Sequence, residues 1–211
     1  METNKITFMK TEQSEWKKCG NLSARAFQDY EYFTNYFSDE TRRRTFLEYA
    51  TAIDIKINYD NITLFTARSG EDILAIAILF PPEVDRVPVS TYLREGMFKA
   101  IIKSGIRDSI AWINMDSKAS EPCNGRPGKS WFLGTLAVEP KVQRQGIGRR
   151  FMSECVIPYV REQGGDELCF ITNSQGNTIF YEKLGFELFD YREFQYKGNT
   201  TQSWSYCMTL S

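Results

Sequence analysis

A short loop with two glycines joins an apolar run to a helical pattern, and it constrains the fold of this chain more than any other segment. Residues 131–138 (WFLGTLAV) form a nearly continuous apolar run, which is typical of a strand covered on both faces. Pro140 lies just beyond the end of that run, and apolar residues at helical spacing follow over 146–162, where Pro158 is expected to kink or shorten the helix. The sequence therefore predicts a strand, a tight glycine loop and a helix, in that order.

The residues of this loop suit a pyrophosphate. Glycines at positions 146 and 148 let the backbone turn tightly and approach a ligand, while the free N–H groups of the helix start point outward. Arg144 and Arg149 can add charge-assisted contacts at the rim. A tight turn that holds no ligand is the alternative interpretation. Two other phosphate-binding motifs are excluded, because a Walker loop needs Lys where Arg149 stands and a dinucleotide fingerprint needs glycine where Phe151 stands.

The rest of the chain reads as short strands and helices. Ahead of residue 131 we expect first a strand over 6–10 and two short helices within 14–36, interrupted at Gly20. A helix from Ser38 to Ile57, whose arginines 42–44 are expected to be solvated, and a hairpin over 62–80 should follow. Helices over 91–113, broken at Gly105, and a loop over 117–129 complete this half. After it we expect a strand over 168–172, a helix over 177–184 closed by Gly185, and strands over 186–194 and 203–210. Strands that alternate with helices in this way indicate crossover connections.

Composition removes several classes of function. A chain of 211 residues fits a single domain, 1–211, and its net charge of -1 lacks the basic face that nucleic-acid binding requires. We see neither a signal-peptide core nor an apolar run long enough to span a membrane, so we expect a cytoplasmic protein with no membrane partner. There is no histidine, which excludes Ser-His and Cys-His relays and every histidine-containing metal site. The five scattered cysteines indicate reduced thiols, and we predict no metal.

The glycine loop lies in a pattern that resembles a known superfamily. Leu136-Ala137-Val138-Glu139-Pro140 followed by Gln143-x-x-Gly146-x-Gly148 is similar to the pyrophosphate-binding motif of the GNAT superfamily of acyl-CoA N-acetyltransferases. The run from Asn177 to Phe186 (NTIFYEKLGF) resembles the next motif of that superfamily, in the same order. Within the superfamily the pattern looks most like the puromycin N-acetyltransferase group, which has a similar final strand to Trp204-x-x-Cys207-Met208-Thr209. The resemblance covers residues 131–211, and 1–130 form the variable, substrate-side half.

The resemblance implies a fold and a set of site residues. The implied α/β (α+β) fold has a mixed, strongly twisted sheet, flanked by helices and splayed in the middle to admit acetyl-CoA as co-substrate. Carried over by position, the backbone of Leu136, Ala137 and Val138 pairs with pantetheine, Asn173 and Asn177 flank it, and Tyr181 is the catalytic acid that protonates the leaving thiolate. The pyrophosphate would be held by the loop residues Arg144, Gln145, Gly146, Ile147, Gly148 and Arg149. Taken in isolation, Tyr181 fits a core aromatic with its hydroxyl satisfied better than a proton donor, and the preceding glycine loop reverses that preference.

The chemistry also leaves questions open. Many relatives place a histidine or glutamate near the start of the central strand, where this chain has Lys129 and Ser130, so we name no general base and assume a chain of water molecules. Glu121 and Glu139 are close in sequence but are expected to be surface carboxylates. The leading hypothesis is acetyl transfer to the primary amine of a small molecule, and the rival is an acyl-CoA-binding sensor without turnover. The acceptor amine, whether it is puromycin or any antibiotic, the oligomeric state and the physiological role are not determined by the sequence.

Overall fold

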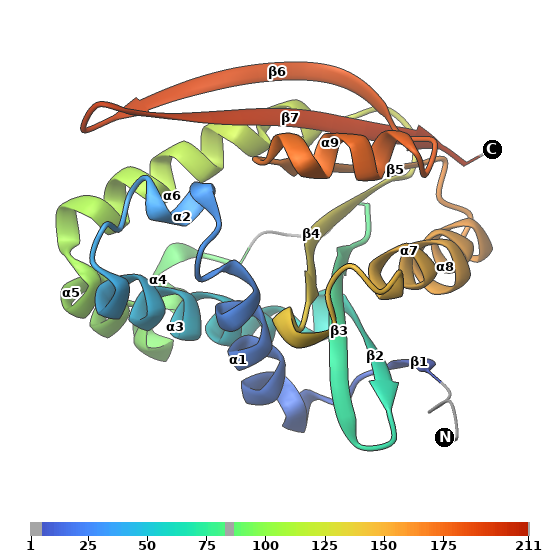
Figure 1. Cartoon of the computed structure of the whole chain (residues 1–211), viewed down its shortest axis with the longest axis horizontal. Coiled ribbons are helices and arrows are strands. Elements are labelled where there is room, and N and C mark those ends of the chain that lie inside the picture. The colour runs from blue at the N-terminus through green and yellow to red at the C-terminus, as the bar shows by residue number, and fades with distance from the viewer. Residues whose placement is uncertain (1–5, 83–86, 211) are drawn as a thin grey trace.

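The protein is described by a computed structural model that covers residues 6–82 and 87–210. Within this part of the chain, one mixed sheet has the strand order β1-β2-β3-β4-β5-β7-β6 (Figure 1). Only the β4–β5 pair is parallel, and the other neighbours are antiparallel. The strands are β1 (Thr7–Lys10), β2 (Thr63–Ser69), β3 (Asp72–Phe80), β4 (Ser130–Val138), β5 (Glu167–Thr172), β6 (Glu187–Tyr196) and β7 (Asn199–Thr209).

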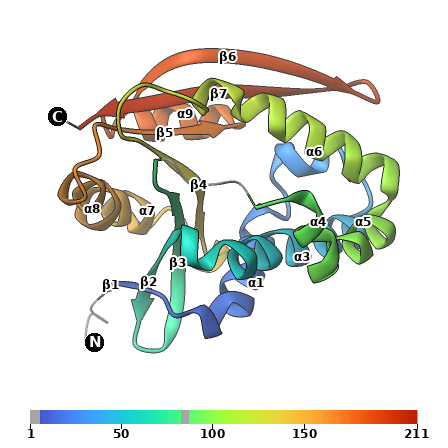
Figure 2. The same ribbon diagram turned by 180° about the vertical axis from the view of Figure 1, so that it is seen from behind.

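Helices cover both faces of this sheet. They are α1 (Trp16–Phe27), α2 (Glu31–Thr34), α3 (Glu40–Asn58), α4 (Val89–Tyr92), α5 (Phe98–Ser104), α6 (Ile106–Ser120), α7 (Ile147–Phe151), α8 (Ile157–Glu162) and α9 (Gln175–Glu182). Helices α1 and α3 pack against one face of β2, β3 and β4, and α7 and α8 against the other. The β6–β7 hairpin extends over α6 in both views (Figures 1 and 2). The fold class expected from the sequence, a mixed twisted sheet flanked by helices, is confirmed.

Three separate apolar clusters hold these layers together. The largest joins α7 and α8 to the sheet through Phe151, Val156 and Val160, which are fully buried. A second, rich in aromatic side chains, joins α2, α3 and α6, and a third joins α1 and α3 to the opposite face of β2, β3 and β4. Tertiary burial of this kind, rather than helix propensity, is the main source of stability for short helices such as these.

Several local predictions were wrong, and at Gly20 and Arg43 a contact with another segment overrode the local signal. Gly20 does not interrupt α1, because it lies where α1 crosses α3 so closely that a Cβ would be 2.6 Å from the Cβ of Ala52. Arg43 is not solvated, since it is 7% exposed and donates to the carbonyls of Gln28 and Phe37. The predicted loop over 117–129 begins late, because α6 continues to Ser120 and a short 3-10 turn follows it.

Other predictions were confirmed or were too cautious. The helix expected from Ser38 is α3, which begins at Glu40; the Asp39 carboxylate caps it by accepting from the Arg42 N–H at 2.8 Å. Gly105, with φ 103°, breaks the helical segment as expected. The irregularity near Pro158 is a π-helical segment, Met152–Val156, that joins α7 to α8. The last two strands pair along a longer hairpin than the sequence indicated, up to Tyr196 and Asn199.

Candidate active site

The site begins where β4 and β5 separate. These strands pair at only three positions, from Ser130 opposite Glu167 to Phe132 opposite Cys169, although β4 continues for six more residues. Figure 1 shows the two strands leaving this common point in different directions. The later part of β4 keeps β3 as a neighbour on one side, and none of the described residues forms a strand on its other side. The splay implied by the resemblance is therefore present.

The backbone of β4 offers hydrogen-bonding groups to this gap. The Glu139 N–H donates to the Leu74 carbonyl at 2.8 Å, so Glu139 and Leu74 form a hydrogen-bonded pair of the antiparallel β3–β4 ladder. Hydrogen-bonded and non-hydrogen-bonded pairs alternate along such a ladder, so every second pair before this one is also hydrogen-bonded. Leu136 and Val138 lie between these pairs, so their N–H and C=O groups face the gap. Ala137 directs its backbone groups to β3, so of the three predicted residues it cannot pair with a ligand through its backbone. The Val138 carbonyl already accepts from the side chain of Gln143 at 2.9 Å.

A β-bulge at Gly134 lies in the middle of the same strand. Ile78 is opposite Thr135 and Leu79 is opposite Leu133, which leaves Gly134 without a partner on β3. The residue is exposed although its neighbours along β4 are buried or half-buried. A Cβ here would lie 2.6 Å from the Phe80 ring, so the close approach of that ring requires glycine. The bulge leaves unpaired backbone groups beside the point where the strands separate.

The glycine loop forms the next side of the site. Arg144 and Gly146 both have positive φ, 61° and 80°, and a Cβ on Gly146 would meet no atom within 4 Å. The backbone N–H of Arg150 donates to the Gly146 carbonyl at 3.0 Å, which is the first hydrogen bond of the helix. The backbone N–H groups of Ile147, Gly148 and Arg149 therefore have no helical acceptor. The loop is thus an open concavity of backbone N–H groups at a helix start.

The arginines around this loop differ in whether they are already held in an ion pair. Arg144, Gln145 and Arg149 are exposed, and neither arginine forms an ion pair with a described residue. Arg150 differs, because it pairs with Glu154 one turn later at 2.8 Å. Two free guanidinium groups beside unpaired N–H groups favour an anion at this position.

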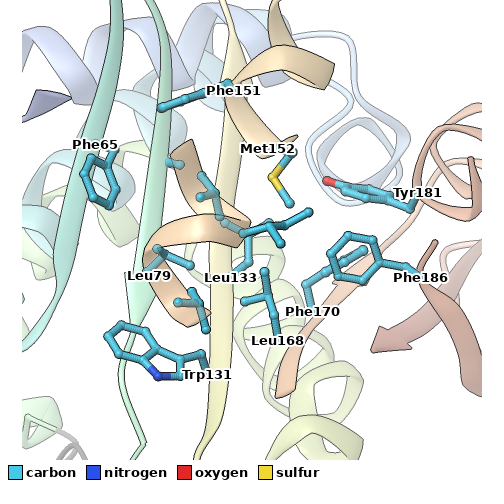
Figure 3. Packing of buried hydrophobic residues seen from close by; sticks show 14 of the residues in the cluster. Phe65, Leu79, Trp131, Leu133, Phe151, Met152, Leu168, Phe170, Tyr181 and Phe186 are labelled. Carbon is cyan, nitrogen blue, oxygen red and sulfur yellow. The ribbon is translucent and has the colours of Figure 1, made fainter. Parts of the chain in front are cut away.

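Tyr181 lies on α9, near the opposite side of the gap. It is 7% exposed, and its ring packs against Phe170, Phe180 and Phe186 at centroid distances of 4.0, 4.9 and 5.9 Å. Its hydroxyl points toward Met152 in Figure 3 and forms no hydrogen bond with any residue that the structure describes. Burial, and to a smaller extent Tyr30 nearby, raises the pKa of this phenol well above its ordinary value, so it remains protonated at neutral pH.

The two predicted asparagines occupy the end of β5 and the first turns of α9. Asn173 donates through its side chain to the Gln202 carbonyl at 2.9 Å, which holds it against β7. Asn177 donates to the hydroxyls of Thr172 and Tyr30, at 3.1 and 3.3 Å. Helix α9 meets α7 across this end of the gap, where a Cβ on Gly148 would lie 3.8 Å from Phe180. The predicted residues on β4, the loop and α9 thus surround one gap.

Tyr30 and Gly134 are site residues that sequence reasoning missed. An isolated glycine inside an apolar strand pattern is a signal for a bulge, and it was available at Gly134. Tyr30 carries no comparable signal, because it comes from the connection between α1 and α2, far away in sequence. It lines a hollow of about 250 Å³ together with Arg25, Ala26, Asp29, Pro140 and Gln143.

The two glutamates considered as general bases are both engaged in ion pairs. Glu139 accepts from Arg25 through two nitrogens, at 2.6 and 3.1 Å, and Glu121 accepts from Arg192 at 2.8 Å. Each carboxylate is thus held by an arginine. Among residues 6–82 and 87–210, no group of three or more metal-ligating side chains could hold a metal ion. In the same part of the chain, no helix has both the length and the apolar character of a membrane span.

Comparison with known proteins agrees with this geometry. Residues 110–188 match the family model described as an acetyltransferase (GNAT) domain. A search of curated proteins finds no match to the chain. Among similar solved structures, the polyamine N-acetyltransferase of Drosophila melanogaster has a TM-score of 0.63 and 15% identity, over 98% of this chain and 100% of that chain. An agmatine N-acetyltransferase has a TM-score of 0.64 and 15% identity, over 97% of this chain and 99% of that chain. A Bacillus subtilis acetyltransferase in complex with CoA has a TM-score of 0.55 and 11% identity, over 98% of this chain and 100% of that chain.

These similarities extend over nearly the whole chain, although the sequence identities are low. At such identity the structural likeness establishes the fold, and the family model adds a specific match to the segment that contains β4, the glycine loop and α9. Residues 110–188 therefore match a GNAT acetyltransferase domain and the whole chain has the fold of such enzymes, which together support an acetyl-CoA-dependent N-acetyltransferase.

Proposed function

We propose that this protein transfers the acetyl group of acetyl-CoA to the primary amine of a small molecule. The observation that carries the proposal is the splayed β4–β5 edge, which has free backbone groups along β4 and an anion-binding loop at its end. An amide-bearing arm with a pyrophosphate at one end has matching chemistry, because amides pair with a free strand edge and a pyrophosphate suits unpaired N–H groups. Acetyl-CoA has both features.

The residues present fit this co-substrate. The space beside Gly146 is open, and Arg144 and Arg149 can contact phosphate oxygens without breaking an existing ion pair. Leu136 offers a free N–H and a free carbonyl to the arm, whereas Val138 offers chiefly its N–H because Gln143 holds its carbonyl. We infer that Leu136 makes the main strand-like contact.

The reaction requires two further contributions from the protein. An amine that attacks a thioester forms a tetrahedral oxyanion, which backbone N–H groups stabilise, and the unpaired bulge at Gly134 is suitably placed to supply one. The departing thiolate then takes a proton, for which Tyr181 is the proposed donor. Its hydroxyl has no partner among the described residues and is protonated at neutral pH, so it has a proton to donate. Proton removal from the amine is assigned to water.

We propose a small molecule as the acceptor for two reasons. Polyamine and agmatine N-acetyltransferases are among the similar solved structures, and both are named for small amines. The resemblance of residues 131–211 to the puromycin N-acetyltransferase group points in the same direction, without making puromycin the substrate. The helices α4 to α6, inserted between β3 and β4, would form the wall of the acceptor site.

Acetyl-CoA and CoA should each raise the melting temperature of the protein. A ligand at 100 times its Kd that binds only the folded state adds about 2.7 kcal/mol, which is about 5 to 10 °C for a chain of this size. CoA that lacks its sulfur should act nearly as well, and ATP, which has no pantetheine arm, is the control. No shift with acetyl-CoA or CoA near 1 mM would exclude the proposed co-substrate.

Release of free thiol from acetyl-CoA with a panel of small amines separates the enzyme from a non-catalytic acyl-CoA sensor. The sensor remains a candidate because Glu121 and Glu139 are both held in ion pairs and no carboxylate base is assigned. We expect amine-dependent thiol release that is unchanged by EDTA. Binding without any release would favour the sensor, and activity lost in EDTA but restored by a divalent ion would contradict the metal-free mechanism.

A further inference from the structure

The hydroxyl of Tyr30 connects the substrate-side half of the chain to the β5 arm of the splay. It accepts from the backbone N–H of Asn173 at 2.8 Å and from the side-chain amide of Asn177 at 3.3 Å. The hydroxyl of Thr172 lies 3.3 Å away. A phenol oxygen with two N–H donors can only donate its own proton to the remaining neighbour, so Tyr30 donates to Thr172. The three contacts give this phenol a fixed orientation.

This network fixes the orientation of the Asn177 amide. Its Nδ2 atom donates to both Tyr30 and Thr172, and these two contacts use both N–H groups of the amide. Its Oδ1 atom, on the other side of the amide, forms no hydrogen bond with a described residue. In this arrangement Oδ1 is the atom of the Asn177 amide that is left for a ligand.

The position of Tyr30 makes this orientation relevant to the gap. Its hydroxyl contacts the end of β5, and its side chain lines the same hollow as Pro140 and Gln143, which follow β4. Tyr30 thus reaches both arms of the splay at their open end.

We propose that Tyr30 is a positioning residue that presents Asn177 Oδ1 as the acceptor for an amide N–H of the pantetheine arm. The proposal rests on the acetyl-CoA site described above. Tyr30 does not touch the reacting atoms. It acts through Asn177, and its loss should affect binding of the arm rather than the chemical step.

The Tyr30→Phe variant keeps the ring and removes only the hydroxyl. We expect calorimetry to show CoA binding about tenfold weaker, with the KM for acetyl-CoA raised to a similar degree and kcat changed by less than about threefold. Binding of the nucleotide half of CoA, which lacks the pantetheine arm, should be unchanged. A merely structural role would not separate these two ligands. The Thr172→Val variant removes the other acceptor of the amide and should weaken CoA binding in the same direction.

A double-mutant cycle shows whether Tyr30 acts through Asn177. If both residues serve one contact, adding Asn177→Ala to Tyr30→Phe should weaken CoA binding by less than about twofold more. Tyr32→Phe is the matched control, because it also removes a buried tyrosine hydroxyl, one that donates to Asp116 on α6. We expect its CoA affinity to stay within about twofold of the wild type.

The outcomes distinguish this proposal from the function on which it rests. A wild-type protein that binds neither acetyl-CoA nor CoA would overturn the proposed function itself. If the wild type binds CoA and Tyr30→Phe binds it equally well, the positioning role is wrong while the function stands. Equal weakening of CoA and of its nucleotide half, or fully additive effects in the cycle, would also overturn the positioning role.

Discussion

Gly146→Glu is expected to abolish CoA binding while the chain still folds. A Cβ on Gly146 meets no protein atom within 4 Å, and a side chain there would occupy the position proposed for the pyrophosphate. Its negative charge would also oppose an anion at the start of α7. We expect calorimetry to detect affinity reduced by at least about a hundredfold, which is about 2.7 kcal/mol.

A second glycine provides the matched control for backbone strain. Gly198, in the turn between β6 and β7, has φ 83° against 80° for Gly146, and a Cβ there also meets nothing within 4 Å. Either substitution forces a side chain into a left-handed conformation, at about 1 to 3 kcal/mol of folding free energy. Gly198→Glu should therefore lower the melting temperature similarly and leave CoA binding intact. CoA affinity of Gly146→Glu within about threefold of the wild type would mean that the loop is only a turn.

Tyr181→Phe should reduce kcat by about 10²- to 10⁴-fold, with little change in CoA affinity. This range corresponds to about 3 to 5 kcal/mol of activation barrier. Because the hydroxyl has no hydrogen-bond partner among the described residues and the ring packing is retained, the melting temperature should hardly change. Steady-state kinetics with the best amine found, together with thermal unfolding, provide both measurements.

Tyr206→Phe is the control for this substitution. Tyr206 stacks on Phe170 in the same aromatic cluster, but its hydroxyl is satisfied by Glu182 at 2.7 Å. Its removal should cost about 1 kcal/mol of stability and leave kcat nearly unchanged. The opposite pattern, in which Tyr181→Phe lowers the melting temperature and leaves kcat unchanged, would remove Tyr181 from the mechanism. A fall of only about tenfold would match a thiolate that leaves moderately well unaided, and would assign the phenol a minor role.

The sequence by itself predicted the parts of this protein that depend on contiguous residues. The apolar run that became β4, the glycines that open α7 and the helix start near Ser38 are local signals, because each requires only a particular backbone conformation or a neighbour a few residues away. The order of these elements, with the resemblance that they carry, was sufficient for the fold class. Tyr181 was predicted as the proton donor from the resemblance and the preceding loop, because the residues in isolation fit a core tyrosine better.

Only the tertiary structure decided which groups remain free for chemistry. Glu139 meets Arg25 across 114 positions of sequence, and Tyr30 meets Asn177 across 147, so neither contact leaves a periodic or local trace in the chain. The register of β3 against β4 determines that the backbone groups of Leu136 face the gap and those of Ala137 do not. The shift in that register is the bulge at Gly134. Gly20 stays inside α1 for a similar reason, since the close crossing with α3 outweighs its poor helix propensity. Residue types thus predicted the chemistry of the site, whereas hydrogen bonds and packing between distant segments determined which groups are available to perform it.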